Sequence, residues 1–263
     1  MALLLQEDCP LLRCAPNFRD VGGLPVEGGG RVATGHLFRS EAIGGVGPED
    51  AARLADCGID VVLDLRSAGE RHKAPQIWWH TQGVRIKEVD VAADIRAMAS
   101  PWTPMIEQPG ERGARTMMIG VYRRLPAASR DAVRAAIEIL ARGEGLLVHC
   151  TAGKDRTGFV VAVVLAAIGV PWRAILSDYM VSGEQLNPHV VATSQAMIAQ
   201  GIGRDPDAAT LAAVTGVRPE YLETAFAALR EEHGGIAAYL AKAGIDAQML
   251  AAVRDRLIEH PGP

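Results

Sequence analysis

The chain has 263 residues, a formal net charge of −4 and a pI near 6.0. This mild acidity argues against a general binder of nucleic acids or membrane surfaces, because such proteins need a basic face. Hydrophobic residues make up 49% of the chain, enough for one large core or for a main domain with a helical annex. We therefore expect a single domain over residues 1–263, with a sheet-bearing core over about 15–180 and a helical lid or annex over about 181–263.

The sequence gives no sign of a membrane span, a secretion signal or a metal site. No stretch reaches the roughly 20 apolar residues that a membrane span needs. The apolar run at residues 1–9 has no basic region before it, unlike a secretion signal. We therefore expect a cytoplasmic protein, although export by a route without a signal stays open. The cysteines lack the spacing of metal ligands, so we expect reduced thiols and neither metal nor cofactor; they are Cys9, Cys14, Cys57 and Cys150.

Strand and helix patterns alternate in the first two thirds of the chain. Residues 59–65 are nearly all apolar and β-branched, which is typical of a parallel strand covered on both faces. This alternation predicts an α/β sandwich with a mainly parallel central sheet and flanking helices. The other strand-like segments are 36–39, 84–91 and 146–150. The predicted helices are 48–56, ending near Gly58; 127–142, capped by Ser129 and ended by Gly143; and 157–168.

The chain after Pro171 is helical throughout, and we expect these helices to pack on the core as an annex rather than to bind DNA. Asp205-Pro206 predicts the start of one helix, which Gly216 closes. Two further helices are predicted at 219–232 and 246–258.

The segment 146–158, LLVHCTAGKDRTG, carries the chemistry. A buried strand that enters a short loop and then a helix turns successive N–H groups inward, forming an anion site at the helix N-terminus. Gly153 lets the backbone curl tightly, and the planar fork of Arg156 can grip two phosphate oxygens. The expected phosphate-binding residues are Thr151, Ala152, Gly153, Lys154, Asp155 and Arg156.

Cys150 lies at the bottom of the same loop and is the predicted nucleophile. The field that holds a phosphate also favours a thiolate, which can attack phosphorus in line and form a phosphocysteine that water then hydrolyses. Thr157 is placed to donate its hydroxyl to the sulfur, steadying it as a leaving group in the second step. His149 either orients the loop through hydrogen bonds or is a core histidine.

The pattern His-Cys-x5-Arg-Thr-Gly resembles the signature of the protein tyrosine phosphatase superfamily, and HCTAGKDR is similar to its bacterial atypical branch, which overlaps with lipid phosphatases. Residues 17–23, NFRDVGG, resemble the N-terminal box of that branch. Residues 62–67, VLDLRS, together with Glu70 resemble its second strand and turn, and the helical tail at 217–240 also fits. The resemblance implies a phosphoric monoester hydrolase, most directly a protein-tyrosine phosphatase with phosphoserine and phosphothreonine as further substrates.

A positioned acid should assist departure of the leaving group, since the conjugate acid of a phenolate has a pKa near 10. The superfamily usually supplies an aspartate from a loop containing Trp-Pro-Asp, which this chain lacks. By resemblance to the narrower branch we favour Asp155, followed by Asp64, although Asp64 could instead form a salt bridge to Arg66 or Arg19. Asp90 and Asp94 remain further candidates.

Lys154 next to Arg156 has two interpretations: it recognises a second phosphate, as on a phosphoinositide headgroup, or it is a solvated lysine. The alternative within the enzyme class is therefore a phosphoinositide or inositol-phosphate phosphatase. The expected partners are a phosphotyrosine protein or a phosphoinositide, with phosphate or another oxyanion in the active site and no nucleic acid. We expect Asn17, Arg19 and Asp20 to be structural residues that attach the N-terminus to the sheet near the site. Residues 178–204 could cover the pocket, as lid helices do in relatives.

Three other interpretations of the loop remain. Arsenate reductases and rhodaneses also place a thiolate in a phosphate-like loop. A catalytically dead phosphate-binding module would keep the loop without turnover, and it is disfavoured because Cys150, Arg156 and Thr157 are all present. The least specific alternative is a glycine-containing turn with an incidental cysteine.

Overall fold

The computed structural model describes residues 12–92 and 101–260. A five-stranded sheet lies at its centre, in the order β1-β3-β6-β4-β5. The four longer strands run parallel, and only the edge strand β1 is antiparallel to its neighbour. The mainly parallel α/β sheet that the sequence predicts is therefore confirmed. The strands are β1 Arg19–Asp20, β3 Leu37–Ser40, β4 Val61–Asp64, β5 Arg85–Glu88 and β6 Leu146–His149.

Both faces of the sheet are covered, and the strands alternate between two hydrophobic clusters. In β4, Val61 and Leu63 face the larger cluster, whereas Val62 faces the smaller one. The neighbouring strand β6 repeats this pattern, with Leu147 on the side of Val62. Strands β3, β4 and β6 are fully buried. Because both of their faces are covered, they do not alternate between buried and exposed residues.

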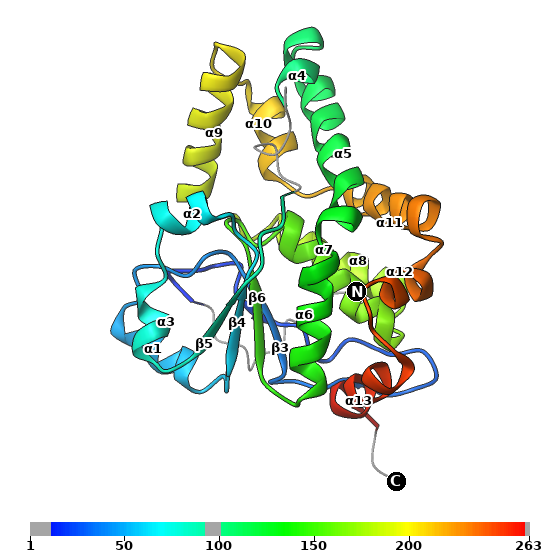
Figure 1. Cartoon of the computed structure of the whole chain (residues 1–263). Helices are drawn as coiled ribbons and strands as arrows, with labels where there is room; N and C mark the ends of the chain where they lie inside the picture. The colour runs from blue at the N-terminus through cyan, green and yellow to red at the C-terminus, as the bar shows by residue number, and fades with distance from the viewer. Residues whose placement is uncertain (1–11, 93–100, 261–263) are drawn as a thin grey trace.

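Helices lie on each side of the sheet (Figure 1). The side with the smaller cluster carries α1 and α3, which contribute Leu54 and Trp79 to the core. The other side carries the long helices that follow residue 110, and they form the larger core. The ranges of the helices beside the sheet are α1 Pro48–Ala55, α3 Ile77–Thr81, α5 Glu111–Ala128, α6 Arg130–Ala141, α7 Asp155–Ile168 and α8 Trp172–Val181.

A second group of helices stands above the carboxyl ends of the strands (Figure 1). There α9 packs through Gly201 on the indole of Trp102, since a Cβ at position 201 would lie 2.1 Å from that ring. Both α10 and α4 pack against α5, whose first turns extend above the sheet. The ranges are α2 Ala68–Lys73, α4 Thr103–Glu107, α9 Pro188–Ile202 and α10 Ala208–Thr215.

The C-terminal helices pack on α5, α6 and α7 and close the larger core. Short strands β2 and β7 pair antiparallel and join residues 31–32 to residues 258–259 near the C-terminus. No single helix in this part of the chain is long and apolar enough to cross a membrane; α12 and α13 pass on length and composition only as a pair, bent by 114°. The ranges are α11 Pro219–His233, α12 Ile236–Lys242, α13 Ala247–Leu257, β2 Arg31–Val32 and β7 Ile258–Glu259.

Two predicted helix starts are wrong. The helix expected from residue 127 is two helices: α5 continues to Ala128, and α6 begins at Arg130. Ser129 lies at the junction, but its buried hydroxyl makes no capping bond and has no partner among residues 12–92 and 101–260. The cap of α10 is Asp207, which accepts from Thr210 N, rather than the Asp205-Pro206 pair. The predicted segment 1–9 lies outside the described residues.

Candidate active site

Residues outside the loop after β6 hold it in place by donating hydrogen bonds to its carbonyl groups. Asn17 Nδ2 donates to Ala152 O at 3.1 Å, and Arg39 Nη2 donates to Gly153 O at 3.0 Å. The carbonyl of Thr151 accepts from Ala42 N at 3.2 Å. Within the part of the chain that the structure describes, no hydrogen bond occupies the N–H groups of residues 151–155. A loop with its carbonyls fixed outward and its N–H groups without protein acceptors has the form of an anion cradle at the start of α7.

Only glycine fits at position 153. Its φ is +69°, in the left-handed region that other residues rarely adopt. A Cβ there would also lie 2.4 Å from the backbone of Ser40 and Glu41. The loop therefore curls directly against the end of β3, as the sequence predicts for this glycine.

Arg39, which is buried, and Arg19, which is half-buried, brace the loop from behind. Arg39 Nη1 and Arg19 Nε donate to the two carboxylate oxygens of Asp178, at 2.6 and 2.8 Å. Both arginines also donate to Ser182 Oγ at 3.1 Å. Burial alone would raise the pKa of Asp178, but the charges of the two arginines outweigh it and lower the pKa. Burial lowers the pKa of Arg19 to about 10.

The N-terminal box has a structural role in this arrangement. Asn17 and Arg19 connect the loop to α8, while Asp20 accepts hydrogen bonds from the N–H groups of Gly22 and Gly35 and so shapes a turn away from the loop. None of Asn17, Arg19 and Asp20 lines the pocket described next. The expectation that the box ties the N-terminus to the sheet near the site agrees with these contacts.

Cys150 and Arg156 share one pocket at the carboxyl end of β6. Cys150 is 2% exposed and lines this opening. The polar part of the lining comes from the loop and the start of α7, from Glu70 of α2, and from Ser194 of α9 and Thr215 of α10. The apolar part comes from three helices that stand above the sheet. These apolar lining residues are Met118 and Val121 of α5, Val190 and Met197 of α9, and Val214 of α10.

Glu70 holds the guanidinium of Arg156. Two hydrogen bonds of 2.8 Å join Nη1 to Oε2 and Nη2 to Oε1, and the hydroxyl of Thr151 also donates to Oε1. Burial alone would raise the pKa of Glu70, but the hydrogen bonds and the charge of Arg156 hold it well below its usual range. Glu70 therefore stays ionised and neutralises part of the positive charge at the loop.

His149 orients the cysteine backbone from the buried side. Its Nδ1 lies 2.9 Å from the carbonyl of Cys150, which can only accept, so Nδ1 carries the proton. Its Nε2 then accepts from the side-chain amide of Gln76. Burial lowers the pKa of His149, which keeps the ring neutral. These contacts agree with the orienting interpretation of His149.

Thr157 is fully buried beneath the loop, and its hydroxyl has no hydrogen-bond partner in the described chain. The predicted bond from Thr157 to the sulfur of Cys150 is therefore not formed in this structure. A buried hydroxyl without a partner is costly, so this group has its donor available for a charge that develops at the sulfur.

The candidate acids lie in different surroundings. Asp155 lines the pocket with Cys150 and is partly exposed. Asp64 is 1% exposed and lies outside the lining of the pocket. Its carboxylate accepts hydrogen bonds from Nε and Nη2 of Arg66, which is one of the two salt bridges that the sequence allowed. Burial alone would raise the pKa of Asp64, but the hydrogen bonds from Arg66 outweigh it and lower the pKa. Asp90 pairs with Arg71 outside the lining, and Asp94 lies outside the described residues.

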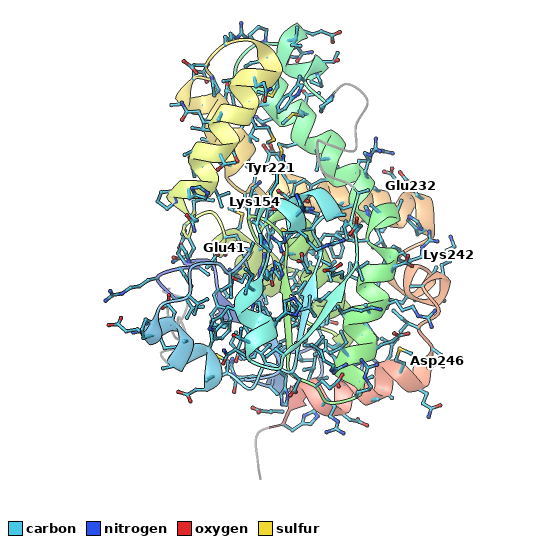
Figure 2. The ribbon with its side chains drawn as sticks, turned by 60° about the vertical axis from the view of Figure 1, so that its left-hand side comes forward. Glu41, Lys154, Tyr221, Glu232, Lys242 and Asp246 are labelled. Carbon is cyan, nitrogen blue, oxygen red and sulfur yellow. The ribbon has the colours of Figure 1, made fainter. Side chains whose placement is uncertain are left out.

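Lys154 is not the solvated lysine that the sequence allowed. It is 5% exposed, and its Nζ donates to Val214 O and Asp155 Oδ1 at 2.9 Å. The carbonyl before Val214, Ala213 O, accepts from the hydroxyl of Tyr221; Lys154 and Tyr221 are labelled in Figure 2. Lys154 therefore ties the phosphate loop to the end of α10, where the exposed helix carbonyls favour a cation.

A parallel sheet whose central strand delivers a cysteine into an anion-binding loop, with an arginine at the start of the next helix, defines a cysteine-dependent phosphatase. The sequence profile of a tyrosine phosphatase family matches residues 11–259. The chain belongs to this tyrosine phosphatase family.

Individual relatives agree with this assignment. A Cupriavidus necator protein provisionally named tyrosine-protein phosphatase is 34% identical, over 85% of this chain and 80% of its own. The triple specificity protein phosphatase PtpB of Mycobacterium tuberculosis is 31% identical, over 92% of this chain and 96% of its own. The solved structure of TpbA from P. aeruginosa covers 68% of this chain and 86% of its own at 20% identity, with a TM-score of 0.31, too low for a structural argument.

Several residues of the site were not singled out from the sequence. Arg39, Asp178 and Gln76 support the loop across large sequence separations, so no local pattern marks them. Glu70 carried a signal, because Ser67-x-x-Glu70 is a capping box at the start of α2. The same carboxylate that caps the helix also holds Arg156.

Proposed function

We propose that the chain hydrolyses phosphotyrosine in proteins, with Cys150 as nucleophile, Arg156 as the phosphate clamp and Asp155 as general acid. The observation that carries this proposal is the convergence of these three residues on one pocket, above a loop whose N–H groups at 151–155 have no protein acceptor. Asp64 is the weaker candidate for the acid, because Arg66 occupies its carboxylate.

In the first step the thiolate of Cys150 attacks phosphorus, so that the S–P bond forms as the bond to the phenol oxygen breaks. The loop N–H groups and Arg156 stabilise the charge on the phosphoryl oxygens. The departing phenolate takes a proton from Asp155 and leaves as tyrosine.

In the second step water attacks the phosphocysteine. Asp155, now a carboxylate, takes a proton from this water, and the sulfur departs as a thiolate. The hydroxyl of Thr157 is proposed to donate to the sulfur at this point, which would satisfy its unpartnered donor. His149 acts through the backbone of Cys150 and keeps the sulfur aimed at the pocket.

The apolar wall of the pocket favours an aryl phosphate. Met118, Val190 and Met197 lie on the side from which a substrate side chain would enter, and an aromatic ring gains from contact with such groups. Phosphoserine and phosphothreonine lack a ring to bury there. They remain poorer substrates in this proposal, although PtpB is named for triple specificity.

A phosphoinositide headgroup is the second candidate, since Lys154 belongs to the pocket lining. To bind a second phosphate, its Nζ would have to leave Asp155 Oδ1 and the carbonyl of Val214. We rank the lipid below phosphotyrosine because these bonds already satisfy the ammonium.

We also propose that the enzyme works in the cytoplasm, because a thiolate nucleophile requires reduced sulfur. The described cysteines Cys14, Cys57 and Cys150 are free thiols. Cell fractionation with an antibody against the chain tests this location.

A side-by-side assay tests the substrate. We expect kcat/KM for a phosphotyrosine peptide to exceed that for a phosphoserine peptide and for phosphoinositide vesicles by about tenfold or more. A preference for the lipid that disappears in Lys154→Met would replace phosphotyrosine by the second candidate. Lys242→Met is the matched control, because Lys242 donates to His233 O in the annex.

A further inference from the structure

Two buried tyrosines form a chain of hydroxyl groups that ends on Asp155. The hydroxyl oxygen of Tyr122 lies 2.5 Å from Asp155 Oδ1 and 2.7 Å from the hydroxyl oxygen of Tyr179. The two tyrosines are 0% and 1% exposed, and their rings meet edge-on at 6.3 Å. Because Tyr122 belongs to α5 and Tyr179 to α8, the first residue of α7 is tied to two neighbouring helices.

The direction of this chain is fixed by what each group can donate. Tyr122 donates its proton to Asp155 Oδ1, so its oxygen accepts the proton of Tyr179. Lys154 Nζ also donates to Oδ1 at 2.9 Å, and an ammonium has no acceptor. Asp155 Oδ1 therefore accepts two hydrogen bonds. The ammonium of Lys154 cannot take a proton from it, and Tyr122 would have to give up its present bond to do so.

The tyrosines are also permanent donors. Burial, followed by the negative charge of Asp155, raises the pKa of Tyr122 well above its ordinary value. Burial raises the pKa of Tyr179 in the same way. Both hydroxyls therefore keep their protons whether Asp155 is ionised or neutral, and the chain need not rearrange when Asp155 gives up its proton.

We propose that Tyr122, supported by Tyr179, is a positioning residue of the general acid: it holds Asp155 Oδ1, so that the proton delivered to the leaving group is carried on Oδ2. In the described chain no hydrogen bond is made to Oδ2, and Asp155 lines the pocket whereas the two tyrosines do not. This inference rests on the proposed role of Asp155 as the acid.

The test compares two substrates that differ only in how much they need the acid. Phenyl phosphate releases a poor leaving group and 4-nitrophenyl phosphate a good one, so the ratio of their kcat/KM values measures proton donation. We expect Asp155→Asn to lower this ratio by about 100-fold and Tyr122→Phe by about tenfold. The double variant should match Asp155→Asn alone, since Tyr122 acts only through Asp155.

The matched control is Tyr239→Phe, which removes another buried hydroxyl, one that donates to Pro126 O. This control should leave the ratio within about twofold of the unmodified enzyme. Thermal unfolding of each variant shows whether the fold is retained, and Tyr179→Phe, which keeps the bond from Tyr122 to Asp155, serves if Tyr122→Phe does not fold. We expect Tyr179→Phe to lower the ratio less than Tyr122→Phe.

The possible failures are distinguishable. If Asp155→Asn lowers the ratio but neither Tyr122→Phe nor Tyr179→Phe does, the positioning role is overturned and the proposed acid stands. If Tyr122→Phe slows both substrates equally and adds to Asp155→Asn, the tyrosine is merely structural and the inference is again overturned. If Asp155→Asn itself leaves the ratio unchanged, the assignment of the acid fails and the inference fails with it.

Discussion

Glu70 accepts a hydrogen bond of 2.8 Å from each terminal nitrogen of Arg156, and both side chains are buried. The carboxylate therefore occupies the Nη1–Nη2 edge of the guanidinium. We therefore expect a bound phosphate to be gripped by the edge formed by Nε and Nη2. Glu70 thus sets the direction of the clamp although it carries the same sign of charge as the substrate.

Replacing Glu70 by glutamine should lower kcat/KM for a phosphotyrosine peptide about tenfold, because the amide keeps one acceptor where the carboxylate offered two. Steady-state kinetics checks this value. Ser67→Ala is the control, since it breaks the capping box of α2 without touching Arg156; it should cost about 1 kcal/mol of stability and leave kcat/KM near the original. Tighter phosphate binding with unchanged kcat/KM in Glu70→Gln would mean that Glu70 competes with substrate instead.

Gly153→Ala should destroy the cradle. The new Cβ would meet the backbone of Ser40 and Glu41 at 2.4 Å, in a left-handed conformation. Gly203 has a similar φ of +72° with nothing within 4 Å, so Gly203→Ala carries only the conformational cost, about 1–2 kcal/mol. Thermal unfolding and inhibition by vanadate should separate the two variants. Equal effects would show that the close approach at Gly153 is unimportant.

Asp178→Asn should be among the most destabilising conservative changes in the chain. It removes the carboxylate charge that pairs with both Arg19 and Arg39, and breaking a buried pair costs about 3–5 kcal/mol. Chemical denaturation measures the change. The exposed pair of Arg123 and Glu231 gives the control, because Glu231→Gln should change stability little. A loss no larger than that of the control would contradict a bracing role for Asp178.

Stability should fall on mild acidification because of His149. Its pKa is lowered in the folded state, so below the unfolded value of about 6.5 the unfolded chain binds an extra proton, and stability drops by up to about 1.4 kcal/mol per pH unit. The loss continues until the pH reaches the folded pKa. A second loss is expected below about pH 4, where the lowered pKa values of Glu70 and Asp178 act with the same sign.

The free energy of unfolding, followed against pH by denaturant titration, checks this behaviour. His149→Gln should reduce the first slope and keep the second; part of the first slope remains because burial also lowers the pKa of His233. The exposed His80→Gln should keep both slopes. If the first slope is unchanged in His149→Gln, the loss of stability on mild acidification comes from another group.

The parts of the fold predicted from sequence are those with strong local patterns. Strands β4 and β6, which are apolar except for their last residues Asp64 and His149, stood out because both of their faces are buried. Helix α5 was not recognised because Gly113, Gly120 and Pro126 interrupt its pattern. Its stability comes from packing against α10 and α11, which no local pattern reveals. The division into a core at 15–180 and an annex at 181–263 stays a prediction.

In the site, too, residues within one local motif could be predicted, whereas residues brought together by folding could not. Residues 149–157 are contiguous, so their chemistry could be predicted together. The bonds from Tyr122 and Glu70 to this segment span 33 and 86 positions, and only the folded chain brings them together. Lys154 shows most clearly what a sequence cannot predict. Its charge suggested contact with a ligand, whereas in the structure its ammonium bonds to Asp155 and Val214.

The central claim is that phosphate passes through the sulfur of Cys150. Rapid acid quenching during turnover of a phosphotyrosine peptide, followed by mass spectrometry of the digested enzyme, tests it directly. We predict one added phosphoryl group on the peptide that contains Cys150, and its absence, together with the loss of turnover, in Cys150→Ser, which should still bind phosphate. Turnover retained in Cys150→Ser, or a phosphoryl group found on another residue, would contradict the account.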